Sequence, residues 1–303
     1  MENSPEMQKA LKDLERVTGI TFQVGADSEA EQAEVLNQIQ LLTNAYREKY
    51  NKSNFIQNLL LDQVPQAEMY GRARKLHVDT EGRRVIFAVE TKYEQDTAAL
   101  ETLQHLFTPQ TKDYIVQVGE KLLILIKHLR DKDTYEEMED VANMIVDMVN
   151  AEAMSQVRVS YSTICNELKD LSRGYKEAKL AIEVGHIFYA ERTVIPYGQL
   201  GIGRLIYQLP IPLCKMFMQE VFGEQLPDTF DEETIVTINK FFENNLNISE
   251  TARQLYVHRN TLVYRLEKLE KDTGLDIRKF DDALTFKIAT MVVNYMKFRN
   301  ERG

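Results

Sequence analysis

Cysteine and histidine are scarce in this 303-residue sequence, and their scarcity argues against a metal site built from these residues. The two cysteines, Cys165 and Cys214, lie far apart, and neither takes part in a CxxC or Cys–His spacing. The five histidines are equally scattered. Structural zinc needs four closely spaced sulfur or imidazole ligands, so we expect no metal site, and we expect no cofactor either.

Long apolar runs are also missing. None approaches the roughly 18 residues that span a bilayer, and the opening MENSPEMQKALKDLER lacks the basic-then-apolar order of a signal peptide. We therefore expect a cytoplasmic protein with no membrane partner. With 44% apolar and 28% charged residues, the chain has the composition of a soluble globular protein long enough for two or three domains.

Basic residues are fewer than acidic ones, and the net charge is −10. Residues 1–227 carry −9 of it and residues 228–303 carry −1, whereas residues 253–271 hold five Lys or Arg against two acids. A phosphate backbone would be attracted to that basic stretch and repelled by much of the remaining surface. The charge pattern therefore favours one docking face for a nucleic acid over many.

That basic stretch falls within residues 247–271, which predict two short helices joined by a tight turn. Ser249 has a hydroxyl that would cap the first helix, and Ala252 is small where the two helices would cross. The turn is expected at residues 256–258, and the second helix from Arg259. This pattern is typical of a DNA-binding helix-turn-helix.

The second helix is predicted to be amphipathic. Leu262, Leu266 and Leu269 recur at i, i+4 and i+7 and would form its buried side. An amphipathic helix with basic residues is most often only a solvated surface, and that alternative stays open from the pattern alone. The residues predicted to contact DNA are Arg259, Asn260, Thr261, Tyr264 and Lys268. Those predicted to contact phosphates are Ser249, Thr251 and Arg265, although Arg265 lies near the edge of the buried side and a structural role is open for it.

Residues 256–275, YVHRNTLVYRLEKLEKDTGL, resemble the C-terminal helix-turn-helix of the PucR and sugar-diacid-regulator (CdaR) family of bacterial transcription regulators. The Val-His-Arg-Asn-Thr-Leu, Tyr-Arg-Leu and Thr-Gly-Leu strings of the family pattern are all present. Val263 departs from it, because relatives often carry a basic residue there. The resemblance implies double-stranded operator DNA as partner and response to a small-molecule effector whose site is unknown. Because symmetric operators are commonly read by two-fold dimers, we also expect a homodimer.

Residues 83–200 alternate strand-like and helix-like patterns, with a hairpin turn expected at Gly119-Glu120, and predict a sheet covered by helices. Their order resembles the GGDEF-like domain that this family places before its helix-turn-helix. Where a diguanylate cyclase has Gly-Gly-Asp/Glu-Glu-Phe, residues 117–121 read QVGEK. The acidic pair that would hold Mg²⁺ is interrupted by a lysine, so we expect no catalytic residues and no enzyme activity.

The two ends of the chain are predicted to be helical. Residues 5–18 read as one helix and residues 29–64 as a longer one, whose apolar seam would either pack against the next domain or contact a second copy. A final helix over residues 281–299 is expected to pack across an earlier helix of the same domain. Their proposed core residues are Ile235, Ile238, Phe241 and Phe242 on the earlier helix, and Leu284, Ile288, Met291, Val292 and Tyr295 on the final one.

These observations predict an α+β multidomain protein. Its parts are an N-terminal helical segment that is a candidate for dimerisation (1–64), a degenerate GGDEF-like α/β domain (65–200), a helical linker (201–227) and an all-α helix-turn-helix domain (228–303). The favoured function is a sequence-specific DNA-binding transcription regulator. The alternatives are a protein-interaction module that does not read DNA, and a nucleotide cyclase with an appended helix-turn-helix.

Overall fold

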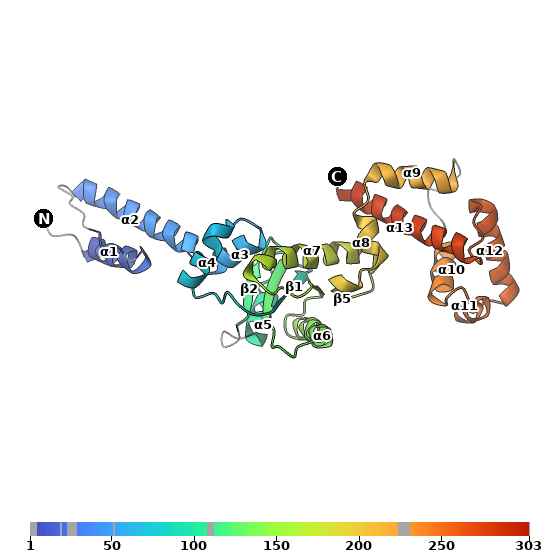
Figure 1. Cartoon of the computed structure of the whole chain (residues 1–303), viewed down its shortest axis with the longest axis horizontal. Coiled ribbons are helices and arrows are strands. Elements are labelled where there is room, and N and C mark those ends of the chain that lie inside the picture. Colours follow the sequence, from blue (N-terminus) through green and yellow to red (C-terminus); the bar gives the residue numbers. More distant parts are fainter. Residues whose placement is uncertain are drawn as a thin grey trace. The chain divides into compact units, whose positions relative to one another are not determined.

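The computed structural model describes residues 5–18, 20–22, 29–50, 52–107, 112–223 and 231–302. The chain divides into two compact units (Figure 1). The first, here called the sheet unit, is Met1–Glu183 with Glu191–Gln199, and the second, the helical unit, is Val184–Ala190 with Leu200–Gly303. Each unit has its own apolar core, and the predicted α+β multidomain class is confirmed.

One five-stranded sheet organises the sheet unit. Its strands lie in the order β2-β3-β1-β4-β5, and all neighbours are antiparallel except β4 and β5. Together with two helices, the first four strands form a βαββαβ unit in which each helix joins two parallel strands that have a third between them. The bounds are β1 Arg84–Thr91, α5 Thr97–Leu106, β2 Tyr114–Gln117, β3 Leu122–His128, α6 Tyr135–Glu152, β4 Val157–Tyr161 and β5 Val194–Pro196.

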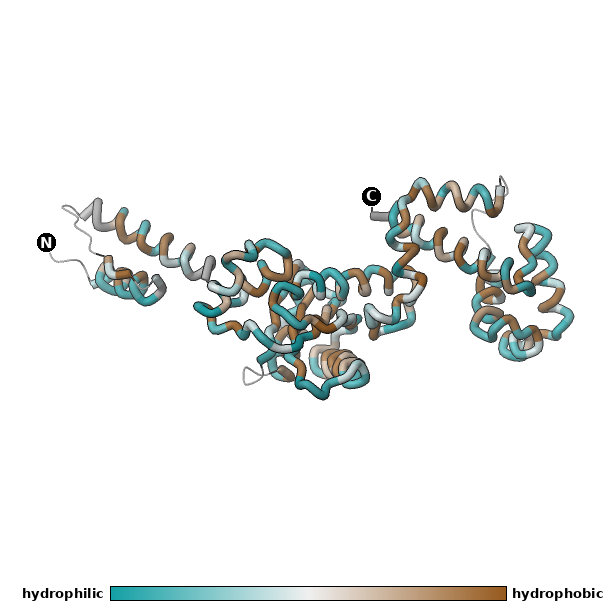
Figure 2. Tube along the Cα trace, in the orientation of Figure 1, coloured by the Kyte–Doolittle hydropathy of each residue, from teal (hydrophilic) through white to brown (hydrophobic). Residues whose placement is uncertain are grey.

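Both faces of this sheet carry apolar side chains, and helices cover both of them. Successive side chains along a strand point to opposite faces. On β1, Val85 and Phe87 pack with α5 and α6, whereas Ile86 and Ala88 point to the opposite face. That second face is covered by α3 (Lys52–Leu60), α4 (Gln66–Lys75) and α7 (Leu171–Phe188). Figure 2 shows the strands as largely hydrophobic, as expected for a sheet buried on both sides.

The long helix predicted over residues 29–64 is divided in two. Helix α2 spans Glu29–Tyr50, and α3 follows from Lys52. The apolar residues of α3 are buried in the core of the sheet, so the alternative that this part packs against the next domain is confirmed. A domain boundary at residue 64, as predicted, would therefore separate α3 from the core into which it packs.

Helix α2 instead pairs with α1 (Pro5–Thr18), whose bounds are those predicted. Met7 and Leu14 of α1 and Ile39 of α2 form a small buried cluster. Leu42 of the predicted apolar seam is 58% exposed, and its neighbour Leu41 is 62% exposed, so part of the seam is uncovered in the single chain. Its use as a dimer contact stays a prediction.

The helical unit has two neighbouring cores that share one long helix. In the first core, α13 packs with α10 through Phe286 and Phe241, as expected. In the second, Val292 and Tyr295 of α13 pack with α8 and α9. The predicted helical linker (201–227) therefore contains two helices, α8 and α9, that belong to a core. The bounds are α8 Ile202–Tyr207, α9 Ile211–Phe222, α10 Glu232–Glu243, α11 Ile248–Gln254, α12 Arg259–Thr273 and α13 Phe280–Arg302.

Two of the proposed core positions are wrong. Ile235 of α10 and Leu284 of α13 are each 45% exposed, because the two helices meet through residues further along each of them, such as Phe241 and Phe286. No helix within the described ranges is both long enough and apolar enough to cross a membrane.

Candidate nucleic-acid interface

Helices α11 and α12 form the predicted helix-turn-helix. The cap of α11 is Asn247, whose side-chain oxygen accepts a hydrogen bond from the backbone N–H of Glu250 at 3.1 Å. The predicted cap, Ser249, is wrong, since this residue lies exposed inside the first turn. Either residue type can cap a helix, and the position of the preceding turn decides between them. Ala252 is buried in the core that both helices share, as expected at a close crossing.

The turn between the helices occupies the predicted residues. Tyr256 has a left-handed backbone with φ of 55°, and its N–H donates to the carbonyl of Arg253 at 3.2 Å. His258 then caps α12, because its Nδ1 accepts from the N–H of Asn260 at 3.3 Å. His258 was predicted to lie in the turn, but its role as a cap was not predicted. The imidazole supplies one of the acceptors that the first turn of a helix lacks.

The buried side of α12 is the one predicted. Leu262, Leu266 and Leu269 all lie in the core of the helical unit. The opposite side carries Tyr264, which is 67% exposed, together with exposed Asn260, Thr261 and Lys268. Arg259, the first residue of α12, is exposed at the start of the helix. All five residues predicted for DNA contact are therefore exposed. These five residues are here called the α12 face.

Two of the predicted phosphate contacts are not available at that surface. Thr251 is fully buried, and its hydroxyl donates to the carbonyl of Asn247 at 2.8 Å, so that prediction is wrong. Arg265 turns toward α10, where it pairs with Glu233 and donates to the Thr237 hydroxyl at 3.2 Å. The burial of Thr251 and the pairing of Arg265 both depend on tertiary packing, which the spacing of residues along a helix does not predict. These contacts support the structural role that the sequence left open for Arg265.

Internal pairing also reduces the local positive charge. Arg253 lies 2.7 Å from Glu250, and this hydrogen bond holds the pKa of the Glu250 carboxyl below its usual value. The pair is therefore ionised and self-compensating near neutral pH. Arg259 and Lys268 make no ion pair with any residue that the structure describes. They are the cations of the α12 face that remain available to a phosphate.

The Thr-Gly-Leu string ends α12. Thr273 donates its hydroxyl to the carbonyl of Leu269 at 2.7 Å, and Gly274 has the left-handed φ of 76° typical of a helix C-cap. Arg278 then joins this end of the helix to the next loop through Glu270 at 2.7 Å and Asp276 at 2.6 Å. The Arg278 hydrogen bond holds the pKa of Asp276 below its ordinary value. This network fixes the length of α12 and was not predicted.

The β2–β3 hairpin of the sheet unit keeps little of a catalytic loop. Gly119 adopts a left-handed φ of 84° at the predicted turn, and the Gln117 side chain donates to its carbonyl at 3.1 Å. The backbone carbonyl of Glu120 accepts from the N–H of Gln95 at 2.7 Å. Within the described ranges, no three His, Cys, Asp or Glu residues are grouped as a metal site would require.

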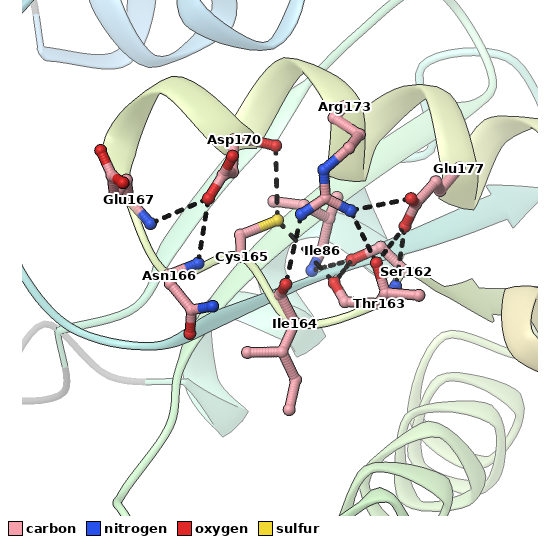
Figure 3. Close-up of polar contacts among 10 residues, drawn as sticks. All are labelled: Ile86, Ser162, Thr163, Ile164, Cys165, Asn166, Glu167, Asp170, Arg173 and Glu177. Carbon is pink, nitrogen blue, oxygen red and sulfur yellow. Dashed lines mark hydrogen bonds and ion pairs between the residues drawn. The ribbon is translucent and has the colours of Figure 1, made fainter.

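The other polar cluster of the sheet unit lies at the start of α7 (Figure 3). Arg173 donates to Thr163 at 2.7 Å and to Glu177 at 2.8 Å, so its charge is used inside the domain. Cys165 is buried beside this cluster, and burial raises the pKa of its thiol to about 11. The thiol therefore stays protonated at neutral pH and is no nucleophile. Gly174 lets α7 lie close to Cys165, since a Cβ at this position would be 2.6 Å from the Cys165 sulfur.

Comparison with known proteins assigns the two regions. Residues 62–184 match the family model of the GGDEF-like domain, and residues 234–292 match that of the PucR C-terminal helix-turn-helix domain. The second match contains α11, the turn and the whole of α12.

Two curated regulators are similar to this chain. The purine catabolism regulatory protein of Bacillus subtilis (strain 168) is 29% identical over 142 residues, which cover 46% of this chain and 27% of that protein. The carbohydrate diacid regulator of Escherichia coli (strain K12) is 24% identical over 276 residues, which cover 84% of this chain and 69% of that protein. The chain therefore spans about a quarter of the first relative's length and about two thirds of the second's.

Among solved structures, the regulator of polyketide synthase expression from Bifidobacterium adolescentis is 15% identical to this chain. The match covers 84% of this chain and 94% of that one, with a TM-score of 0.36. A score this low supports no statement about the fold.

Proposed function

Since this chain belongs to the PucR/CdaR family of transcription regulators, we propose that it reads a specific operator in double-stranded DNA through the α12 face. The observation that carries the proposal is the exposure of five polar or aromatic side chains on α12, a helix whose leucine side is buried in the core. A helix anchored in this way can enter the major groove without exposing apolar residues.

The proposed contacts divide by chemistry. Asn260, Thr261 and Tyr264 have side chains that can hydrogen-bond or pack against base edges, which carry the sequence information. Arg259 and Lys268 would hold phosphates and fix the register of the helix. Ser249, exposed in the first turn of α11, has a hydroxyl that could donate to a phosphate.

A homodimer and a metabolite signal complete the proposal. One α12 helix covers a short site, and symmetric operators are commonly read by two-fold dimers. Exposed Leu41 and Leu42 on α2 support this helix as a contributor to the dimer contact. The two relatives are named for purine catabolism and for carbohydrate diacids, which supports a small-molecule effector for this chain as well.

The sheet unit is proposed to relay that signal without catalysing a reaction. Its hairpin offers one carboxylate, Glu120, next to Lys121, where a cyclase needs paired acids for Mg²⁺. Incubating the protein with GTP and Mg²⁺ should therefore yield no cyclic product. Glu120→Ala should leave DNA binding unchanged, and an activity that this substitution abolishes would overturn the non-catalytic assignment.

Selection of bound DNA from a random duplex pool tests the reading function directly. The full chain should enrich one motif, and its affinity for that motif should fall steeply with salt because phosphate contacts release counterions. A pool that stays random after repeated rounds would favour an interaction module that does not read DNA. Light scattering at tens of micromolar, with and without the enriched duplex, tests the dimer, and a monomer under both conditions would remove it.

A further inference from the structure

Tyr256, in the turn between α11 and α12, combines two unusual properties. Its side chain is 96% exposed, although tyrosine usually buries much of its ring. Its backbone is left-handed, with φ of 55°. A bulky residue in this region is rare, because its Cβ crowds the following carbonyl oxygen. Glycine would form the same turn without that strain.

Two backbone hydrogen bonds close α11 at this turn, from the N–H of Tyr256 to Arg253 and from the N–H of Val257 to Ala252, but they need only the backbone and do not use the tyrosine ring. Leu246, in the turn before α11, has a similar φ of 63°, but its side chain packs against the core of the helical unit. Burial of apolar surface therefore compensates Leu246. The ring of Tyr256 gains no such burial. A strained and exposed side chain is a candidate for a contact made only with a partner.

The place of Tyr256 indicates which partner. It lies two residues before His258, whose imidazole caps α12, and three before Arg259 on the α12 face. In a helix-turn-helix the N-terminal end of the second helix enters the major groove, so the turn before it lies beside the phosphates at the groove edge. A phenol suits that position, because its hydroxyl can donate to a phosphate oxygen and its ring can pack against a deoxyribose.

We propose that Tyr256 is a DNA-positioning residue whose hydroxyl donates to a backbone phosphate where α12 enters the groove. The inference rests on the proposed function and adds to it a residue that the charge pattern does not reveal. Because the phenol is neutral, its contact displaces no counterion. Its loss should therefore lower the affinity without changing the salt dependence, unlike the loss of a lysine contact.

The test measures fluorescence anisotropy of a labelled random-sequence duplex with the full chain over a salt series, and Tm by calorimetry. Tyr256→Gly should weaken binding by about fivefold to tenfold at every salt concentration, because it removes both the hydrogen bond and the contact of the ring with the backbone. The same substitution should raise the Tm of the helical unit by about 3 °C, since the strain is relieved. Tyr256→Phe, which keeps the ring, should weaken binding by about threefold.

Met154 provides a matched control in the sheet unit, because it is 88% exposed with φ of 49°. Met154→Gly should relieve comparable strain and leave DNA affinity unchanged. If Tyr256→Gly binds as the wild type does, the inference is overturned while the proposed function stands. A lowered Tm would show a structural role and also overturn it, and wild-type affinity of Tyr256→Phe would overturn the hydrogen bond. If the wild type shows no salt-dependent binding, the proposed function fails and this inference fails with it.

Discussion

Helices α7 and α12 carry basic residues near their starts and use them in opposite ways. In α7, Arg173 is held by Thr163 and Glu177 within hydrogen-bonding distance. In α12, Arg259 makes no ion pair with any residue that the structure describes. An arginine whose donors are satisfied inside its own domain holds a loop in place, whereas one without partners is available to a phosphate. The neighbouring acids therefore decide the role, and the basic residue alone does not.

The largest effect is expected where α7 is packed most tightly. In Gly174→Ala the new Cβ would lie 2.6 Å from the Cys165 sulfur and 2.8 Å from Cγ1 of Ile86, which is closer than packed atoms approach. We expect a loss of about 3 kcal/mol in the free energy of unfolding of the sheet unit, as for an overpacked core. Urea denaturation followed by circular dichroism measures it, and DNA binding by folded protein should not change.

Gly71 of α4 is the matched control for this substitution. A Cβ at Gly71 meets no atom within 4 Å, and the residue lies inside a helix. Gly71→Ala should therefore stabilise the sheet unit by about 0.5–1 kcal/mol, since alanine favours the helix. If both glycine variants changed stability in the same direction, packing against Cys165 would not be the cause at Gly174.

The next largest effect is expected from base reading by the α12 face, a role that is not proposed for α7. Asn260→Ala should cost about 2 kcal/mol in binding to the selected operator and little on random duplex, because a base-edge hydrogen bond matters only where its partner base is present. Anisotropy titrations on both duplexes measure the difference. Asn294→Ala, on an exposed position of α13, is the control and should bind both duplexes like the wild type. Equal losses on both duplexes would assign Asn260 to the backbone.

A smaller effect should come from the cap that starts α12. Before α7, the Asp170 carboxylate accepts from the N–H groups of Asn166 at 3.2 Å and Glu167 at 3.1 Å in the capping box of a short 3-10 helix, whereas α12 depends on the Nδ1 of His258. His258→Ala should lower the free energy of unfolding of the helical unit by about 1 kcal/mol, and His258→Asn should restore most of it. Chemical denaturation of the three proteins decides this, and an equal loss in both variants would rule out the cap.

Local patterns predicted the elements of the interface well. The leucine repeat of α12, the turn at residues 256–258 and the closing Gly274 all depend on residues a few positions apart, so the sequence contains the relevant physics. The cap of α11 was misplaced because Asn247 and Ser249 are both good capping residues and only the backbone of the turn chooses between them.

Long-range packing could not be predicted from the same patterns. Thr251 is buried by the fold of the helical unit, and Arg265 finds its partner Glu233 far away in the sequence. Helices α8 and α9 read as a linker because their apolar residues show no partner until α13 lies against them. The exposure of Asn260, Thr261, Tyr264 and Lys268 was predicted correctly, since it follows from the helical period, but their contact with DNA stays a prediction.

The smallest effect separates a lysine without a close ion pair from a paired one. Lys268 on the α12 face makes no ion pair with any described residue, whereas Lys176 of α7 lies 3.2 Å from Asp62. Lys268→Ala should weaken binding to operator and random duplex alike, by less than about tenfold at moderate salt, and should reduce the slope of log K against log salt by about one. Lys176→Ala should leave that slope unchanged, because its charge is compensated and lies outside the helical unit. Titrations at four or more salt concentrations measure both slopes. If the two variants keep the wild-type slope, Lys268 contacts no phosphate, and the absence of an internal partner does not identify a DNA-binding lysine in this chain.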